Sequence, residues 1–247
     1  MSESVATPPP EVTAPPKSLP ARLVGVVFSP QETFRSIVAH PNWVAAVLTV
    51  GLLIGGAQFA FLSTQVGQDA QLDQQLRTME NFGVNITPQM QQDMEAGLPR
   101  ARYWALGAIL VMSFVFVPLF AGIGYVVFNA MMGGSATFKQ VLAVVAHAGA
   151  ISLLGQLFAV PLNYARETMS SATNLSVFLP FLEEGSVLAR FTGMIDIFII
   201  WWLVVLAIGF GVLYRRKTSA IVASFAGAYV VIAAVAAIVM RAFAGSQ

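Results

Sequence analysis

Long apolar stretches dominate the pattern of hydrophobic and polar positions along this chain. Five of them reach the roughly 20 mainly apolar residues that a helix needs to cross a bilayer, over residues 43–63, 103–131, 139–163, 191–214 and 220–240. The fourth is apolar on every side, unlike a barrel strand, and backbone in lipid must satisfy its own hydrogen bonds. The pattern predicts an all-α, polytopic integral membrane protein, with a five-helix transmembrane bundle within residues 43–242.

The third stretch carries polar side chains among many Ala and Gly residues, namely His147, Ser152 and Gln156. Small and polar residues of this kind form buried helix–helix contacts in membranes. We interpret this stretch as a span packed inside the bundle. A re-entrant segment is the alternative.

A short amphipathic segment, residues 21–42, precedes the first span. Residues 23–28 are apolar but too few to cross a membrane, and the Ser-Pro pair that follows them is a helix-start signal. Phe34, Ile37 and Val38 then have the spacing of one helical face. We expect a short N-terminal interfacial helix, and a helix packed as the lead-in to the first span is the alternative.

The longest polar segment is the loop between the first two spans, residues 64–102. Leu and Met side chains at helical spacing predict a first helix in it. Thr87 before Pro88 predicts the start of a second helix, which Gly97 and Pro99 should end. We expect a helical hairpin in this first external loop.

The chain starts with a proline-rich tail, residues 1–20. Such a segment cannot bury apolar surface, so we expect it to be disordered. It lacks the basic start and immediate apolar core of a secretory leader, so no cleaved signal peptide is expected.

Composition supports the membrane assignment. Hydrophobic residues make up 57% of the chain and charged residues 10%, against roughly 25% charged residues in soluble domains. The absence of cysteine excludes disulfides, thiolate metal sites and cysteine nucleophiles. The net charge of +1 argues against nucleic acid as a partner.

The tight turn between the fourth and fifth spans determines the predicted topology. It contains Arg215, Arg216 and Lys217, and basic residues in short loops favour the cytoplasm. An odd number of spans then places the N-terminus in the cytoplasm and the C-terminus outside.

Asp196 is the only acidic residue inside a predicted span. A buried carboxylate in a membrane needs compensation. At a rise of about 1.5 Å per residue, Gln58, Gln156 and Asp196 fall at a similar depth in the outer half of the membrane. Two interpretations follow: an intramembrane polar cluster that binds an ion, a proton or a lipid headgroup, or a hydrogen-bonded clasp between helices.

His147 is a secondary polar candidate nearer the cytoplasmic side, and we interpret it as a packing residue. The other histidine is His40, and two histidines without cysteine or a nearby carboxylate make a poor metal site. The chain has no nucleophile-elbow, zinc-protease or phosphate-loop motif. We therefore expect no enzyme, no catalytic residues, no metal and no cofactor.

Three segments carry a family resemblance: FSPQETFRSI at residues 28–37 followed by PNW at 41–43, GGSATFKQ at 133–140 leading into AVVAHA at 143–148, and IDIF at 195–198 running through Trp201 to AIG at 207–209. With them the chain resembles the Yip family (Ypt/Rab-interacting proteins), in particular its bacterial members. The resemblance implies a five-span fold with a cytoplasmic N-terminus, in the bacterial cytoplasmic (inner) membrane. Eukaryotic members are linked to small GTPases and to vesicle traffic between endoplasmic reticulum and Golgi, and they are not known as enzymes.

The expected function is that of a non-enzymatic membrane scaffold or adaptor of the Yip type, since the tail has no recognisable GTPase-binding motif. It would organise the membrane or recruit a partner protein at the cytoplasmic face. The alternative is a small transporter or channel subunit using Asp196, Gln156 and Gln58, although the inverted repeat of many transporters is missing. Membrane lipids and a cytoplasmic protein are the expected partners, nucleic acid is not, and a homo-oligomer is compatible with the sequence.

Overall fold

The computed structural model describes residues 17–183 and 185–244, so most of the expected disordered tail lies outside the described residues. The described chain is helical and contains no named strand. Its elements are α1 (Leu19–Phe28), α2 (Pro30–Ala39), α3 (Trp43–Leu62), α4 (Gln65–Asn81), α5 (Pro88–Tyr125), the π-helix η1 (Val126–Met131), α6 (Phe138–Ala148), α7 (Ala150–Arg166), the short 3₁₀ helix η2 (Leu175–Phe178), α8 (Val187–Met194), α9 (Ile197–Tyr214) and α10 (Thr218–Ala244).

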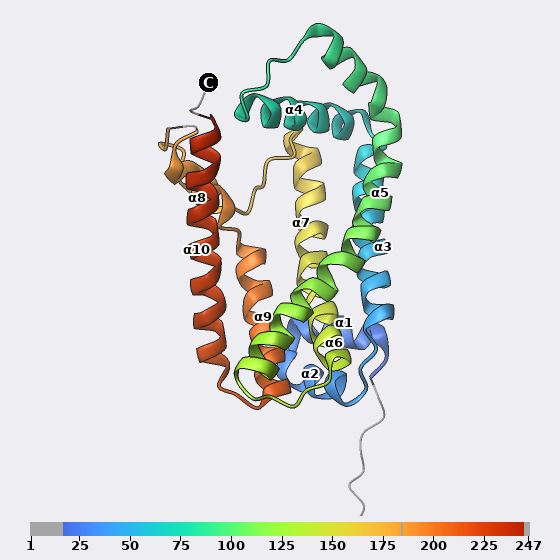
Figure 1. The fold of residues 1–247 in the computed structure, drawn as a ribbon. Helices are drawn as coiled ribbons and strands as arrows, with labels where there is room; N and C mark the ends of the chain where they lie inside the picture. The colour runs from blue at the N-terminus through green and yellow to red at the C-terminus, as the bar shows by residue number, and fades with distance from the viewer. Residues whose placement is uncertain (1–16, 184, 245–247) are drawn as a thin grey trace, which may run out of the picture.

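Within this described part, five helical segments are long and apolar enough to cross a membrane, namely Trp43–Leu62, Pro88–Met131, Phe138–Arg166, Ile197–Tyr214 and Thr218–Ala242. They run along the length of the molecule, with α1 and α2 at one end and α4 across the other, where α10 also ends (Figure 1). The predicted all-α polytopic bundle is confirmed.

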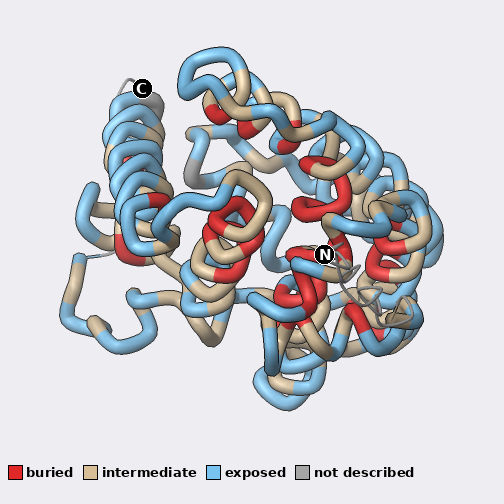
Figure 2. The backbone as a smooth tube through the Cα atoms, turned by 90° about the horizontal axis from the view of Figure 1, so that it is seen from below, coloured by how far each residue is buried: buried red, intermediate tan, exposed pale blue. Residues whose placement is uncertain are grey.

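Apolar side chains cover the outside of the spans. Leu52 on α3, Val111 on α5, Ile200 on α9 and Ile232 on α10 are all exposed. Figure 2 shows the buried residues gathered in the inner helices, while the helix that ends at the C-terminus is mostly exposed. An apolar exterior of this extent needs lipid around it. The protein is therefore an integral membrane protein in contact with lipid.

The third span is the most deeply packed element. Every residue from Val141 to Ala148 in α6 is buried, and α7 continues the segment beyond a break at Gly149. α6 and α7 together extend from the end that holds α2 to the end that holds α4 (Figure 1). The structure thus agrees with a span inside the bundle and not with a re-entrant segment.

The hairpin after the first span differs in detail from the predicted one. The second helix was expected to end at Gly97 and Pro99, but α5 runs from Pro88 without a break into the second span. A Cβ at Gly97 would contact nothing within 4 Å. Pro99 removes one backbone donor without stopping this helix, so the outer arm of the hairpin is the extended start of α5.

The fourth span starts later than the predicted residue 191. The short helix α8 ends at Met194, and α9 begins at Ile197. The carboxylate of Asp196 accepts a hydrogen bond from the Phe198 backbone N–H at 2.8 Å. Asp196 is thus the N-cap of the span and not a residue within it.

One three-way contact joins the N-terminal helices to the bundle. Phe34 of α2 and Val144 of α6 are fully buried, and both meet α9 at Gly209. A Cβ on Gly209 would lie 2.6 Å from Val144 Cγ1 and 3.1 Å from Phe34 Cε1. The missing side chain of Gly209 is therefore what lets α2, α6 and α9 approach so closely. Below we call this contact the α2 clamp.

The side of α1 that faces the bundle contains a buried arginine beside the core residue Val26. Arg22 is buried, and its guanidinium donates to the carbonyl oxygens of Lys17 at 2.9 Å and His40 at 2.8 Å. Burial lowers the pKa of Arg22, and the two carbonyls compensate for part of the lost hydration. Val24 and Phe28 face outward and are 58% and 81% exposed. An apolar face turned outward is typical of a helix in contact with lipid.

We predict that Gly209→Ala destabilises the protein because the new methyl group overpacks the α2 clamp. Overpacking of a filled core costs about 1–3 kcal/mol. Thermal unfolding of the purified chain in detergent measures the loss. The matched control is Gly227→Ala on α10, where a Cβ meets nothing within 4 Å. An equal loss of stability in both variants would contradict the clamp.

Candidate functional site

The predicted intramembrane polar residues do not form one cluster. Gln156 of α7 donates from Nε2 to Oε1 of Gln58 on α3 at 3.0 Å, so these two meet as the sequence suggests. Asp196 forms its hydrogen bonds with other residues. The glutamine pair therefore has the geometry of an interhelical hydrogen bond between the first and third spans.

Asp196 fastens a loop to the start of α9. Besides capping the helix, its carboxylate accepts hydrogen bonds from the hydroxyl groups of Ser171, at 3.0 Å, and Thr173. The backbone adds an antiparallel bridge between Asn174 and Asp196. The three hydrogen bonds to the Asp196 side chain and the positive end of the helix dipole stabilise its negative charge, which would otherwise be costly in a membrane.

His147 lies apart from these residues, in the buried part of α6. It is fully buried, and because a carbonyl can only accept, its Nδ1 donates to the Ala143 carbonyl oxygen, at 2.8 Å. Its Nε2 has no hydrogen-bond partner among the described residues. No group of three His, Cys, Asp or Glu side chains within that part of the chain is arranged to hold a metal ion.

The turn after α9 lies at the same end of the bundle as α1 and α2. We call this end, formed by α1, α2, residues 132–139 and residues 215–217, the basic end. It carries the basic residues Lys17, Arg22, Arg35, Lys139, Arg215, Arg216 and Lys217. Glu32 is the one acidic residue that the described chain places there, and Lys17 donates to it at 2.7 Å. This hydrogen bond and the charge of Lys17 lower the pKa of Glu32.

The basic end contains a cavity of about 950 Å³ that the sequence did not reveal. It lies between α2, the loop after η1 and the turn after α9. Arg35, Arg215 and Arg216 line it together with the amides Gln31 and Gln140, and its lining contains no carboxylate. We call it the arginine cavity. The sequence indicated the basic turn at residues 215–217. It did not indicate that Arg35 lines the same cavity, because that depends on the position of α2.

Tight contacts hold the loop that forms one wall of the arginine cavity. Tyr214 Oη donates to Asn129 Oδ1 at 2.7 Å, and Asn129 Nδ2 donates to the Ala136 carbonyl oxygen at 2.7 Å. Gly134 lies against the Tyr214 ring, where a Cβ would be 2.7 Å from the ring carbon Cδ1. Arg216 Nη2 donates to the Met132 carbonyl oxygen at 2.9 Å. Hydrogen bonds and packing therefore hold this wall in place.

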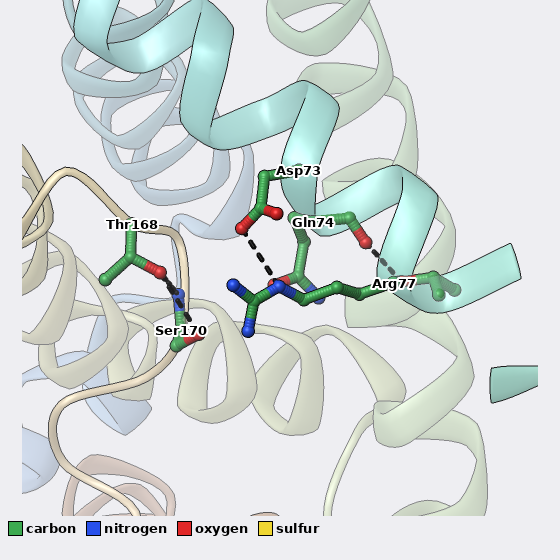
Figure 3. Close-up of polar contacts among 6 residues, drawn as sticks. Asp73, Gln74, Arg77, Thr168 and Ser170 are labelled. Atoms are coloured by element: carbon green, nitrogen blue, oxygen red, sulfur yellow. Dashed lines mark hydrogen bonds and ion pairs between the residues drawn. The ribbon is translucent and has the colours of Figure 1, made fainter. Parts of the chain in front are cut away.

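The opposite end of the molecule carries charges of both signs in nearly equal number. Its described acidic residues are Asp69, Asp73, Glu80, Asp93, Glu95, Glu167 and Glu183, and its basic residues are Arg77, Arg100, Arg102, Arg166, Arg190 and Arg241. Asp73 pairs with Arg77 on α4 at 3.0 Å. Figure 3 shows this pair beside the loop in which Thr168 and Ser170 form a hydrogen bond. The two ends of the bundle thus differ in charge.

Comparison with known protein families shows to which family this chain belongs. The model of one family, the Yip1 domain, matches residues 24–241 and so includes α2, all five spans and the arginine cavity. The chain belongs to the Yip1 domain family. The Yip1 domain family is a family of non-catalytic membrane proteins. Comparisons with curated proteins and with solved structures found no match.

We predict that Asp196→Ala costs about 1–2 kcal/mol of unfolding free energy, because it removes the cap of α9 and the anchor of the loop. Asp196→Asn should cost much less, because the amide oxygen still accepts from the Phe198 N–H. Thermal unfolding together with limited proteolysis of the loop at residues 168–178 measures both effects. Equal losses for the two variants would instead mean that the negative charge of Asp196 is what the protein requires.

Proposed function

We propose that this Yip1 domain protein is a non-enzymatic scaffold of the bacterial cytoplasmic membrane, which recruits a partner protein to its basic end. The observation that carries the proposal is the α2 clamp. The clamp holds α2 against α6 and α9. The hydrogen bonds of Tyr214, Asn129 and Arg216 hold the loop after η1 and the turn after α9 beside it. A surface held in this way loses little conformational entropy on binding. This surface is the docking platform.

The distribution of charge supports a cytoplasmic position for the platform. Basic residues near span ends favour the cytoplasmic side, and the basic end carries Arg35, Arg215, Arg216 and Lys217 against the single acidic residue Glu32 of the described chain. The N-terminus is then cytoplasmic, and α10 ends outside.

We place residues 21–42 at the cytoplasmic interface of the membrane. The outward Val24 and Phe28 of α1 would enter the acyl region, while the buried face of α2 remains in the clamp.

Transport is a weaker proposal for this chain. A substrate or ion pathway needs polar groups that are available to the substrate. Gln58 and Gln156 bond to each other, and Asp196 accepts from three donors. These contacts support a structural role for all three residues, which join helices or loops by hydrogen bonds.

We predict that a photo-crosslinking amino acid at exposed Thr137 or Lys217 on the basic end captures the same protein in living cells. Both positions belong to the proposed platform, so one partner should be within reach of each. Mass spectrometry of the crosslinked products measures this.

The matched control for the capture is Gln91, which is exposed near the start of α5 at the opposite end. It should not capture the same protein. Products made only of lipid and further copies of this chain, from all three positions, would contradict the adaptor function.

A further inference from the structure

The arginine cavity has more positive charge than its own residues neutralise. Arg35 and Arg215 are exposed into solvent, and their side chains make no hydrogen bond or ion pair with another described residue. Arg216 donates only one of its five N–H groups, to the Met132 carbonyl oxygen. Glu32, the one acidic residue that the described chain places at this end, forms its ion pair with Lys17 at 2.7 Å and interacts with Arg35 only through the charge, without an ion pair. Three guanidinium groups around one cavity without a carboxylate have the chemistry of an anion site.

The position of the cavity points to the kind of anion. It lies where η1 and α9 end, and the ends of membrane spans lie at the level of the lipid headgroups. Its lining includes the apolar residues Val38, Val212 and Leu213. Met131 at the end of η1 and Phe28 at the end of α1 are 76% and 81% exposed and can contact acyl chains. An amphiphilic ligand with a phosphate head fits this combination better than a free ion does.

The geometry points to a binding site for the phosphate group of an anionic phospholipid in the arginine cavity. Arg35 from α2 and Arg216 from the turn after α9 hold the phosphate from two elements, and Arg215 adds charge. Basic pockets between spans on the cytoplasmic side are known to take anionic headgroups. The inference does not depend on the proposed partner protein, because lipid binding and protein capture are measured separately.

Native mass spectrometry of the purified full-length chain tests this site. The chain is delipidated and offered equal amounts of phosphatidylglycerol and phosphatidylcholine with identical acyl chains. The native chain should retain phosphatidylglycerol in preference, and this preference should weaken as salt rises. The double variant Arg35→Gln/Arg216→Gln should lose roughly fivefold in phosphatidylglycerol affinity per arginine, or about 25-fold in total, with phosphatidylcholine unchanged.

The matched control is Arg100→Gln/Arg166→Gln, which removes two exposed arginines from the opposite end of the bundle. It should bind as the native chain does. Arg215 and Lys217 remain in the test variant, so the turn stays basic. If that variant does not fold, Arg35→Lys/Arg216→Lys replaces it and should retain part of the preference, because the charge persists while the planar fork is lost.

Three results would overturn the site. They are no preference for phosphatidylglycerol in the native chain, an unchanged preference in the double glutamine variant, and an equal loss in the control. Inorganic phosphate distinguishes the source of the ligand. If it displaces phosphatidylglycerol completely at millimolar concentration, the cavity binds free phosphate and the lipid assignment is wrong.

Discussion

The contact among Phe34, Val144 and Gly209 is the constraint on which the rest of the structure depends. It places α2, which is too polar to cross a membrane, against α6 of the third span and α9 of the fourth. Protein interiors are close-packed, so one missing side chain at Gly209 determines how near α2 can lie. Without this approach Arg35 would not face the turn after α9. The arginine cavity therefore follows from a packing contact and not from the basic residues alone.

Polar groups within the spans and at their ends serve mainly to fix the architecture. Gln58 and Gln156 join the first and third spans, and Asp196 sets the start of the fourth and holds the loop before it. Tyr214 and Asn129 join the second and fourth spans next to the arginine cavity. Each pair satisfies groups that would be costly to leave unpaired in lipid. Because these polar groups already bond to one another, they are not available to a ligand. The charged surface of the basic end remains available for recognition.

The sequence was sufficient to predict the class of fold but not the site. Five long apolar stretches have one physical solution in lipid, so the spans could be predicted. The family resemblance came separately, from the three short segments at residues 28–43, 133–148 and 195–209. The start of α9 was misplaced because Asp196 was assigned to the interior of a helix, whereas its short side chain favours capping. The continuity of α5 through Pro99 was missed because a proline signal is local, whereas helix packing is not. The arginine cavity depends on tertiary distances between Arg35 and Arg216, which no spacing along the chain encodes.

The placement of the basic end in the cytoplasm is the central claim, and cysteine labelling tests it most directly. The native chain has no cysteine, so single variants Ser135→Cys at the basic end and Ser170→Cys at the opposite end report without background. A membrane-impermeant maleimide is applied to intact bacterial cells and, separately, to permeabilised cells. We expect Ser170→Cys to be labelled in intact cells and Ser135→Cys only after permeabilisation. The reverse pattern would contradict the orientation and, with it, the cytoplasmic platform.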